Sequence, residues 1–167
     1  MTIPEATQRV VEAGRVLGFE VDVHFFPEGT KTSQDAADAI GCQLSAIAKS
    51  IVLTLDEAEQ VVVFASGDTR IDLELLARAA GATSARRATL DEARSATGFA
   101  AGGTPPIGYP GKVRVFADIA LRRHLEVWSA GGTPTTVFPI PLQTLVNLTG
   151  ATWVEATEQP VTGANSR

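Results

Sequence analysis

The chain has 167 residues, a length that suits one compact domain, because two independent cores would be crowded at this size. Hydrophobic residues make up 44% and charged residues 20%, which argues against a wholly disordered chain. The formal net charge of −5 argues against a protein that coats duplex nucleic acid, so we expect no duplex DNA partner. Contact with one RNA end remains compatible with this charge.

The sequence argues against both a membrane-inserted protein and a metal-binding protein. No apolar run approaches the roughly 20 residues that span a bilayer, and the N-terminus lacks a signal-peptide layout, so we expect a cytoplasmic protein without a membrane partner. The single cysteine, Cys42, excludes an intramolecular disulfide and every multi-cysteine metal site. His24 and His124 lie far apart, and the sequence has no GxGxxG or Walker loop. We therefore expect neither a metal nor a cofactor.

The first half of the chain predicts an alternation of helices and strands. In chain order the expected elements are a helix over 4–17 ended by Gly18, a strand over 19–26, a short helix capped by Thr32 or Ser33 and ended by Gly41, a strand over 47–55, a hairpin turn over 56–59, and a strand over 61–65. The unbroken apolar run of the last strand indicates burial on both faces. The hairpin is expected at the centre of the fold.

The second half continues the mixed pattern. In chain order it predicts a helix over 73–80 ended by Gly81, a helix between the capping-box pair Thr89 and Glu92 and the stop at Gly98, an irregular loop over 99–111, a strand over 113–116, a helical turn over 119–124, strands over 126–129 and 135–138, and a helix over 141–149. These elements favour an α/β (α+β) class with a mixed, largely antiparallel sheet. We expect a single domain over 1–156 and a loose tail over 157–167.

Lys49 is the first candidate for chemistry. Strand alternation places it on the same face as Ile47, Ile51 and Leu53, which is the side expected to face the core. An isolated buried ammonium is expensive, so it must reach water, pair with an anion or lower its pKa. The position is compatible with a functional lysine, and equally with a snorkelling side chain or a structural ion pair.

The glycine- and proline-rich loop over 99–111 is the second candidate. Gly102 and Gly103 permit close backbone approaches, while Pro105 and Pro106 stiffen the segment that follows. Exposed amides in such a loop can bind a carbonyl, a phosphate or a developing oxyanion. An ordinary rigid connection between a helix and a strand has the same composition.

Weaker signals surround these two. Asp68, after Gly67, is either a turn residue or a site residue, and the segment Ser129–Thr133 suits either a pocket wall or a hairpin turn. Neither histidine lies near a nucleophile motif, so no Ser-His-Asp arrangement is indicated. Positive charges occur in pairs that could meet a few phosphates or simply be solvated, namely Arg86 with Arg87, Lys112 with Arg114, and Arg122 with Arg123.

The order of four segments resembles one family over roughly residues 32–154. These segments are IAKSIVL, VVVFASGDTRIDLELLARAAGA, ARRATLDEARSATGFAAGGTPPIGY and VFADIALRRHLEVWSAGGTPTTVFPI. The chain is similar to the YbaK and prolyl-tRNA-synthetase-associated editing domains, most specifically in Lys49 and the GxxxP loop from Gly102 to Pro106. The resemblance implies a barrel-like sheet flanked by helices and a freestanding, metal-independent hydrolase of mischarged aminoacyl-tRNA.

The resemblance also implies roles for individual residues. Lys49 would anchor the terminal nucleotide or its phosphate, and Gly102 and Gly103 would present catalytic amides in a reaction assisted by the substrate's own ribose hydroxyl. The expected substrate-binding residues are Pro106, Ser50, Asp68, Ser129, Gly131 and Gly132. Members that remove alanine tend to carry histidine near the position of Ser129, so this chain departs from that pattern.

The sequence therefore favours a deacylase of mischarged aminoacyl-tRNA. The expected partner is the acceptor end of the tRNA, typically a proline tRNA carrying a wrong amino acid, with prolyl-tRNA synthetase as a further partner. Two alternatives stay open at this point. One is a binding module for aminoacyl-tRNA or a synthetase that leaves the ester intact, and the other is a hydrolase of small aminoacyl or nucleotide esters.

Overall fold

The computed structural model describes residues 2–30 and 32–158. In chain order its elements are α1 (Glu5–Val16), β1 (His24–Phe25), α2 (Ser33–Ile40), the 3-10 helix η1 (Leu44–Ala46), β2 (Ala48–Leu55), β3 (Glu59–Ser66), α3 (Leu73–Ala79), β4 (Ala85–Arg87), α4 (Leu90–Thr97), β5 (Arg114–Asp118), the 3-10 helix η2 (Ile119–Arg123), β6 (Glu126–Ala130), β7 (Thr136–Pro141), α5 (Leu142–Thr149) and β8 (Thr152–Val154). The expected mixed α/β class is confirmed. Within these ranges no helix has the length and apolar character needed to cross a bilayer.

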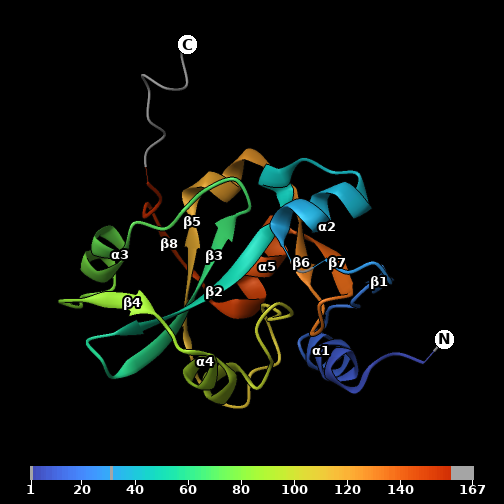
Figure 1. The fold of residues 1–167 in the computed structure, drawn as a ribbon, viewed down its shortest axis with the longest axis horizontal. Coiled ribbons are helices and arrows are strands. Elements are labelled where there is room, and N and C mark those ends of the chain that lie inside the picture. Colours follow the sequence, from blue (N-terminus) through green and yellow to red (C-terminus); the bar gives the residue numbers. More distant parts are fainter. Residues whose placement is uncertain (1, 31, 159–167) are drawn as a thin grey trace, which may run out of the picture.

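The strands are divided between two sheets. A five-stranded sheet has the order β4-β2-β3-β5-β8, and a three-stranded sheet has the order β1-β7-β6 (Figure 1). Pairing is antiparallel except between β3 and β5 and between β5 and β8, so the prediction of a mixed, largely antiparallel arrangement is confirmed. An isolated parallel bridge between Ile47 and Trp128 joins the two sheets.

The β2–β3 hairpin is the centre of the larger sheet. The two strands pair from Ala48 with Ser66 to Leu55 with Glu59, and the turn places Asp56 and Glu57 at φ 51° and 56°. Positive φ at both turn residues matches the twist of a tight hairpin. Because side chains alternate, β2 contributes to two cores, one on each face of the sheet. The hairpin therefore holds the two halves of the interior together.

Local signals fix the helix ends that the sequence predicts. Thr32 and Thr89 each accept a hydrogen bond from the third helical N–H, and Asp35 and Glu92 complete the two capping boxes. Helices α2, α4 and α5 end at glycines in the left-handed conformation, at positions 41, 98 and 150. These boundaries agree with the sequence-based expectations because they depend on neighbouring residues alone.

The helical turn expected over 119–124 is confirmed as the 3-10 helix η2. Four other elements differ from expectation. The strand expected over 19–26 is reduced to His24–Phe25, because Val21 packs into the core without a strand partner. The 3-10 helix η1 precedes β2, where the sequence predicts no helix. Strands β4 and β8 were not predicted, since three residues carry no recognisable period.

The C-terminal segment returns to the sheet. Asp72 N–H donates to the Ala156 carbonyl and Glu158 N–H donates to the Arg70 carbonyl, both at 2.7 Å. Thr157 forms an antiparallel bridge with Ile71. The chain is thus held for two residues beyond the expected domain boundary at 156, and the rest of the predicted tail, 159–167, lies outside the described residues.

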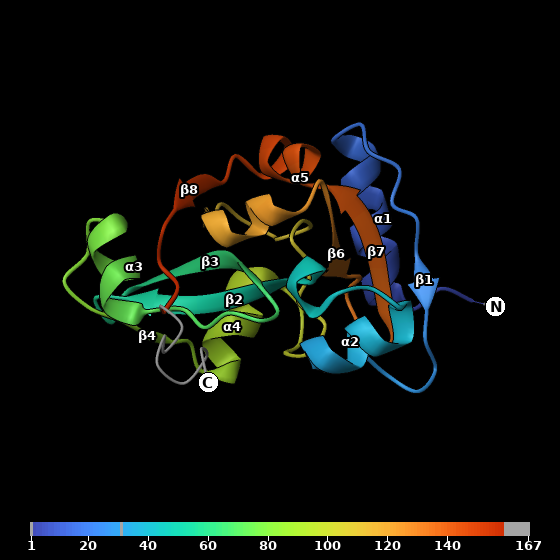
Figure 2. The same ribbon diagram turned by 90° about the horizontal axis from the view of Figure 1, so that it is seen from above.

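Helix α1 lies beside the three-stranded sheet, as the view from above shows (Figure 2). Its Val10 is fully buried in the core, and its buried Thr7 hydroxyl lies 3.2 Å from the hydroxyl of Thr136 on β7. This contact places α1 directly behind the segment that joins β6 to β7.

We predict that Asp118→Ala lowers the free energy of unfolding by about 1–3 kcal/mol, because it removes the acceptor of two backbone donors, one of which is buried. The Asp118 carboxylate is fully buried and accepts hydrogen bonds from Ala120 N–H at 2.9 Å and Ala156 N–H at 2.8 Å. Urea denaturation measures the change. The control is Glu20→Ala at an exposed position, and equal effects of the two variants would contradict the assigned role of Asp118.

Candidate functional site

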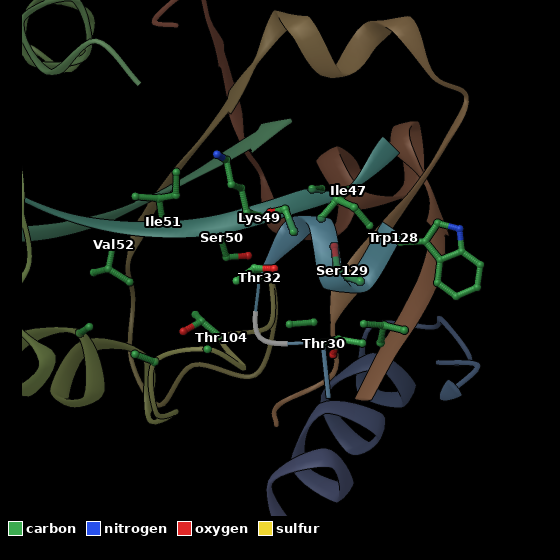
Figure 3. A pocket seen from close by; sticks show the side chains of 18 of the residues that line it. Thr30, Thr32, Ile47, Lys49, Ser50, Ile51, Val52, Thr104, Trp128 and Ser129 are labelled. Carbon is green, nitrogen blue, oxygen red and sulfur yellow. The ribbon is translucent and has the colours of Figure 1, made fainter. Parts of the chain in front are cut away.

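A cavity of about 410 Å³ opens beside β2. Its walls come from β2, the start of α2, the connection from β4 to α4, the glycine-rich loop and β6 (Figure 3). Of the residues expected to form the site, it is lined by Lys49, Ser50, Gly102 and Ser129. Four candidates from three separate parts of the sequence thus share one cavity.

Lys49 and Ser50 leave β2 in opposite directions (Figure 3). The Lys49 ammonium, half-buried, donates a hydrogen bond to the Thr69 carbonyl at 2.7 Å. Burial lowers the pKa of Lys49, Arg87 and Arg70 lower it further, and Asp68 opposes the shift. Lys49 is therefore a cation held at a cost on the face of β2 opposite the Ser50 side chain, and it belongs to the cavity lining.

Two serine hydroxyls in the cavity wall lack hydrogen-bond partners. The Oγ atoms of Ser50 and Ser129 are buried, and neither meets hydrogen-bond geometry with another atom of the described residues. Ser129 is 1% exposed, so its hydroxyl depends on a water or a ligand in the cavity for a partner. Ser50 on β2 and Ser129 on β6 thus each bring a hydroxyl to the cavity wall, and the Ser50 hydroxyl also lies within reach of the Tyr109 hydroxyl.

The two adjacent glycines of the loop have different surroundings. Gly102 has φ 90°, is exposed and lines the cavity, so a left-handed conformation brings the backbone to the cavity wall. Gly103 is buried, and its N–H points to the Ala100 carbonyl at 3.4 Å. A Cβ on Gly103 would lie 2.6 Å from the Cα and carbonyl carbon of Thr133. Gly103 is thus required for close packing of two loops.

Tyr109 holds the other end of the glycine-rich loop. Its hydroxyl donates to the Pro105 carbonyl at 2.7 Å and lies beside Ser50 on β2. Burial raises the pKa of Tyr109, so the hydroxyl keeps its proton and remains a donor at neutral pH. Pro106, the last residue of the GxxxP motif, is buried and outside the cavity lining. The loop is therefore fixed on both sides of the exposed Gly102.

Three other expected site residues lie outside the cavity lining. Asp68 forms an ion pair with Arg123 at 2.7 Å, and this partner lowers the pKa of the Asp68 carboxyl. Gly132 has φ 103°, and a Cβ there would lie 2.9 Å from the carbonyl oxygen of Ala6. A Cβ on Gly131 would lie 3.0 Å from the Thr136 hydroxyl. The glycines at 131 and 132 let the β6–β7 segment pack tightly on itself and on α1.

Sequence reasoning did not select several residues that line the cavity. They are Thr30, Thr32, Arg87, Leu90, Thr104 and Trp128. Thr104 lies inside the GxxxP motif, so the sequence offered a reason to include it among the site residues. Arg87 belongs to a charged pair in the sequence, but its approach to Lys49 depends on the pairing of β4 with β2.

The described residues contain no group of three or more histidine, cysteine, aspartate or glutamate side chains placed to hold a metal ion. Cys42 is a poor nucleophile, because burial raises the pKa of its thiol. The chemical groups that the cavity offers are therefore backbone amides, hydroxyls and neighbouring cations. This set suits binding of a polar, negatively charged ligand and stabilisation of an oxyanion.

Comparison with protein families identifies the class of this fold and site. Residues 27–148 match the model of the aminoacyl-tRNA editing domain. The match covers most of the chain, so the protein belongs to the aminoacyl-tRNA editing domain family, as the motifs around Lys49 and Gly102 predict.

The relatives include proteins matched over most of their length and a ligase matched over a fifth of its length. A crystal structure of a candidate trans-editing enzyme for prolyl-tRNA synthetase superimposes with a TM-score of 0.88 at 34% identity, covering 95% of this chain and 100% of that one. The uncharacterised protein YwhH of Bacillus subtilis is 32% identical over 114 residues, which are 68% of this chain and 72% of YwhH. A proline–tRNA ligase of Citrifermentans bemidjiense is 32% identical over 113 residues, which are 67% of this chain and 20% of the ligase.

We predict that Gly103→Ala lowers the free energy of unfolding by about 1–3 kcal/mol, because the new methyl group cannot fit against the Thr133 backbone without a shift of one loop. Thermal or urea unfolding measures the effect. Gly111→Ala is the matched control, since a Cβ there meets nothing within 4 Å. If Gly103→Ala were as stable as Gly111→Ala, the close packing of the two loops would not constrain the site.

Proposed function

We propose that the protein is a trans-acting deacylase that hydrolyses the ester of mischarged aminoacyl-tRNA. Membership of the aminoacyl-tRNA editing domain family supports this activity. The observation that carries it is one cavity lined by Lys49, Ser50, Gly102 and Ser129. The similarity to a candidate trans-editing enzyme and to a proline–tRNA ligase supports a proline tRNA as the carrier.

The cavity residues bind and orient the substrate in this proposal. The ester carbonyl lies against the loop at Gly102, where a backbone amide stabilises the charge that develops on its oxygen. Ser50 and Ser129 hydrogen-bond to polar groups of the terminal nucleoside or the amino acid, which satisfies their hydroxyls. Lys49 lies on the opposite face of β2 from Ser50, and its ammonium binds the phosphate of the terminal nucleotide.

Hydrolysis uses water and assistance from the substrate. The ribose hydroxyl next to the ester orients a water molecule, whose oxygen forms a bond with the ester carbonyl carbon. The bond from that carbon to the ribose oxygen breaks, and the proton from water passes to the ribose oxygen. The products are the free amino acid and tRNA with both terminal hydroxyls. No protein nucleophile is needed, which agrees with the protonated Cys42, and we propose that no metal is needed.

The test of the function is a panel of proline tRNAs charged with proline or with wrong amino acids. We expect the full-length protein to release at least one wrong amino acid faster than buffer does, to spare prolyl-tRNA, and to keep its rate in the presence of EDTA. Release of radiolabelled amino acid measures the activity. Saturable binding of every tRNA without release would replace the proposal with a binding module.

We predict that Lys49→Ala lowers kcat/KM on the preferred mischarged tRNA by about 100-fold, because a charged contact to the substrate is lost. The fold should persist, since burial makes the charged lysine costly: it lowers the Lys49 pKa, so at neutral pH the ammonium destabilises the folded state.

Circular dichroism and thermal unfolding check the fold of Lys49→Ala. Lys112→Ala is the control, because Lys112 is exposed and lines a different cavity. Full activity of the Lys49 variant would remove this side chain from the proposed mechanism.

A further inference from the structure

Two cations, Lys49 and Arg87, lie on one face of the larger sheet, and a third, Arg70, lies in the loop that contacts the Lys49 ammonium. Strand alternation puts Lys49 on the same face as Leu53, and the register pairs Leu53 with Arg87 on β4. The loop after β3 brings Thr69 to the Lys49 ammonium at 2.7 Å, and Arg70 follows directly. Both arginines are near enough to lower the pKa of Lys49. Lys49, Arg70 and Arg87 therefore form a cluster, named here the cation rim.

Most other arginines near this region already have partners. Arg86 binds the carboxylates of Glu57 and Glu92, and Arg114 binds Glu59 through two hydrogen bonds of 2.9 Å. Arg123 binds Asp68, and the Arg122 guanidinium lies 4.3 Å from the centre of the Trp153 ring. Carboxylates thus neutralise one arginine of each charged pair, namely Arg86, Arg114 and Arg123. Arg87 has no such partner among the described residues and lies at the cavity.

The two arginines of the cation rim, Arg70 and Arg87, are free to bind a ligand. Neither Arg70 nor Arg87 forms an ion pair or a side-chain hydrogen bond with any residue in the described ranges, and both are exposed. The closest carboxylates in sequence are occupied, since Asp68 binds Arg123 and Asp72 caps α3. Within the part of the chain that the structure describes, the only carboxylate that raises the pKa of Lys49 is Asp68, which is already bound to Arg123. Three positive charges close together are unexpected in a protein of net charge −5. An anion placed there would relieve the mutual repulsion.

An uncovered edge of β2 connects the cation rim with the cavity. Strand β4 pairs with β2 only over Leu53–Leu55, and the last bond on this side joins Ala88 N–H to the Val52 carbonyl at 3.0 Å. All six residues from 47 to 52 line the cavity, although successive side chains point to opposite faces. The cavity therefore follows the unpaired stretch of β2 between the Trp128 bridge at Ile47 and the Ala88 hydrogen bond at Val52, next to the face that carries Lys49.

We propose that Arg70 and Arg87 extend the phosphate contact assigned above to Lys49 and bind the phosphates of the single-stranded 3′ end of tRNA, on the 5′ side of the terminal nucleotide. The inference rests on the proposed function, which places the terminal ester in the cavity. Guanidinium groups match phosphate oxygens in a bidentate way, so two free arginines beside a lysine suit successive phosphates of one strand. The acidic remainder of the protein limits contact to this short segment.

The test compares two substrates that carry the same ester. One is the preferred mischarged tRNA, and the other is the matching 3′-aminoacyl-adenosine, which has no phosphate. We expect Arg70→Gln and Arg87→Gln each to raise KM for the tRNA by about 5- to 10-fold, close to 1 kcal/mol of binding per contact, with little change in kcat. The loss on the tRNA should exceed the loss on aminoacyl-adenosine at least about 5-fold.

Salt dependence gives a second readout that a general loss of stability would not produce. Removing one phosphate contact to a single strand should reduce the slope of log affinity against log salt by about 0.7. Lys112→Gln removes one positive charge from a separate cavity and should change neither KM nor the slope. Equal losses on both substrates, or none on either, would overturn the phosphate site.

Binding of the single-stranded ribonucleotide CCA, followed by fluorescence anisotropy, separates this inference from the proposed hydrolysis. If the protein hydrolysed no ester, yet bound CCA at least about 5-fold more tightly than the double variant Arg70→Gln/Arg87→Gln, the deacylase function would fall and the phosphate site would stand. If tRNA were hydrolysed and the double variant bound CCA as tightly as the unmodified protein, the phosphate site would fall alone.

Discussion

The incomplete pairing of β2 is the constraint on which the rest of the site depends. Strand β2 pairs with β3 along its full length, but with β4 over three residues only. A fully paired strand would separate its two faces, so that the Lys49 ammonium and the Ser50 hydroxyl would belong to different surfaces. The uncovered edge joins them into one site. It also explains why Lys49, whose side chain leaves β2 in the opposite direction from Ser50, still lines the same cavity.

The opposite wall depends on a stack of backbone segments. Helix α1 packs against the β6–β7 segment at Gly132, and this segment packs against the glycine-rich loop at Gly103. Tyr109 fixes the same loop from the side of β2 through the Pro105 carbonyl. The matched family region begins at residue 27, yet α1 precedes it and supports this wall. The N-terminal helix is therefore part of the structure that positions the cavity.

Charge is distributed in two ways on this acidic protein. Arg86, Arg114 and Arg123 are neutralised by nearby carboxylates, which stabilise loops and strand ends. Lys49 instead remains close to Arg70 and Arg87, and its lowered pKa records the cost of that position. Unfavourable charge that the fold does not neutralise is typical of a binding site, where a ligand supplies the missing partner.

The sequence by itself determined the features that depend on neighbouring residues. Capping boxes at Thr32 and Thr89 set helix starts, apolar runs marked β2 and β3, and Lys49 and Gly102 stood out as an unexpected cation and a loop glycine. Tertiary structure alone decided the rest. It paired Arg87 with β2, gave Gly103 a packing role, and bound Asp68 to Arg123, because these outcomes depend on contacts between segments far apart in the chain. Local pattern specifies conformation and burial, whereas strand register and loop packing specify which groups meet.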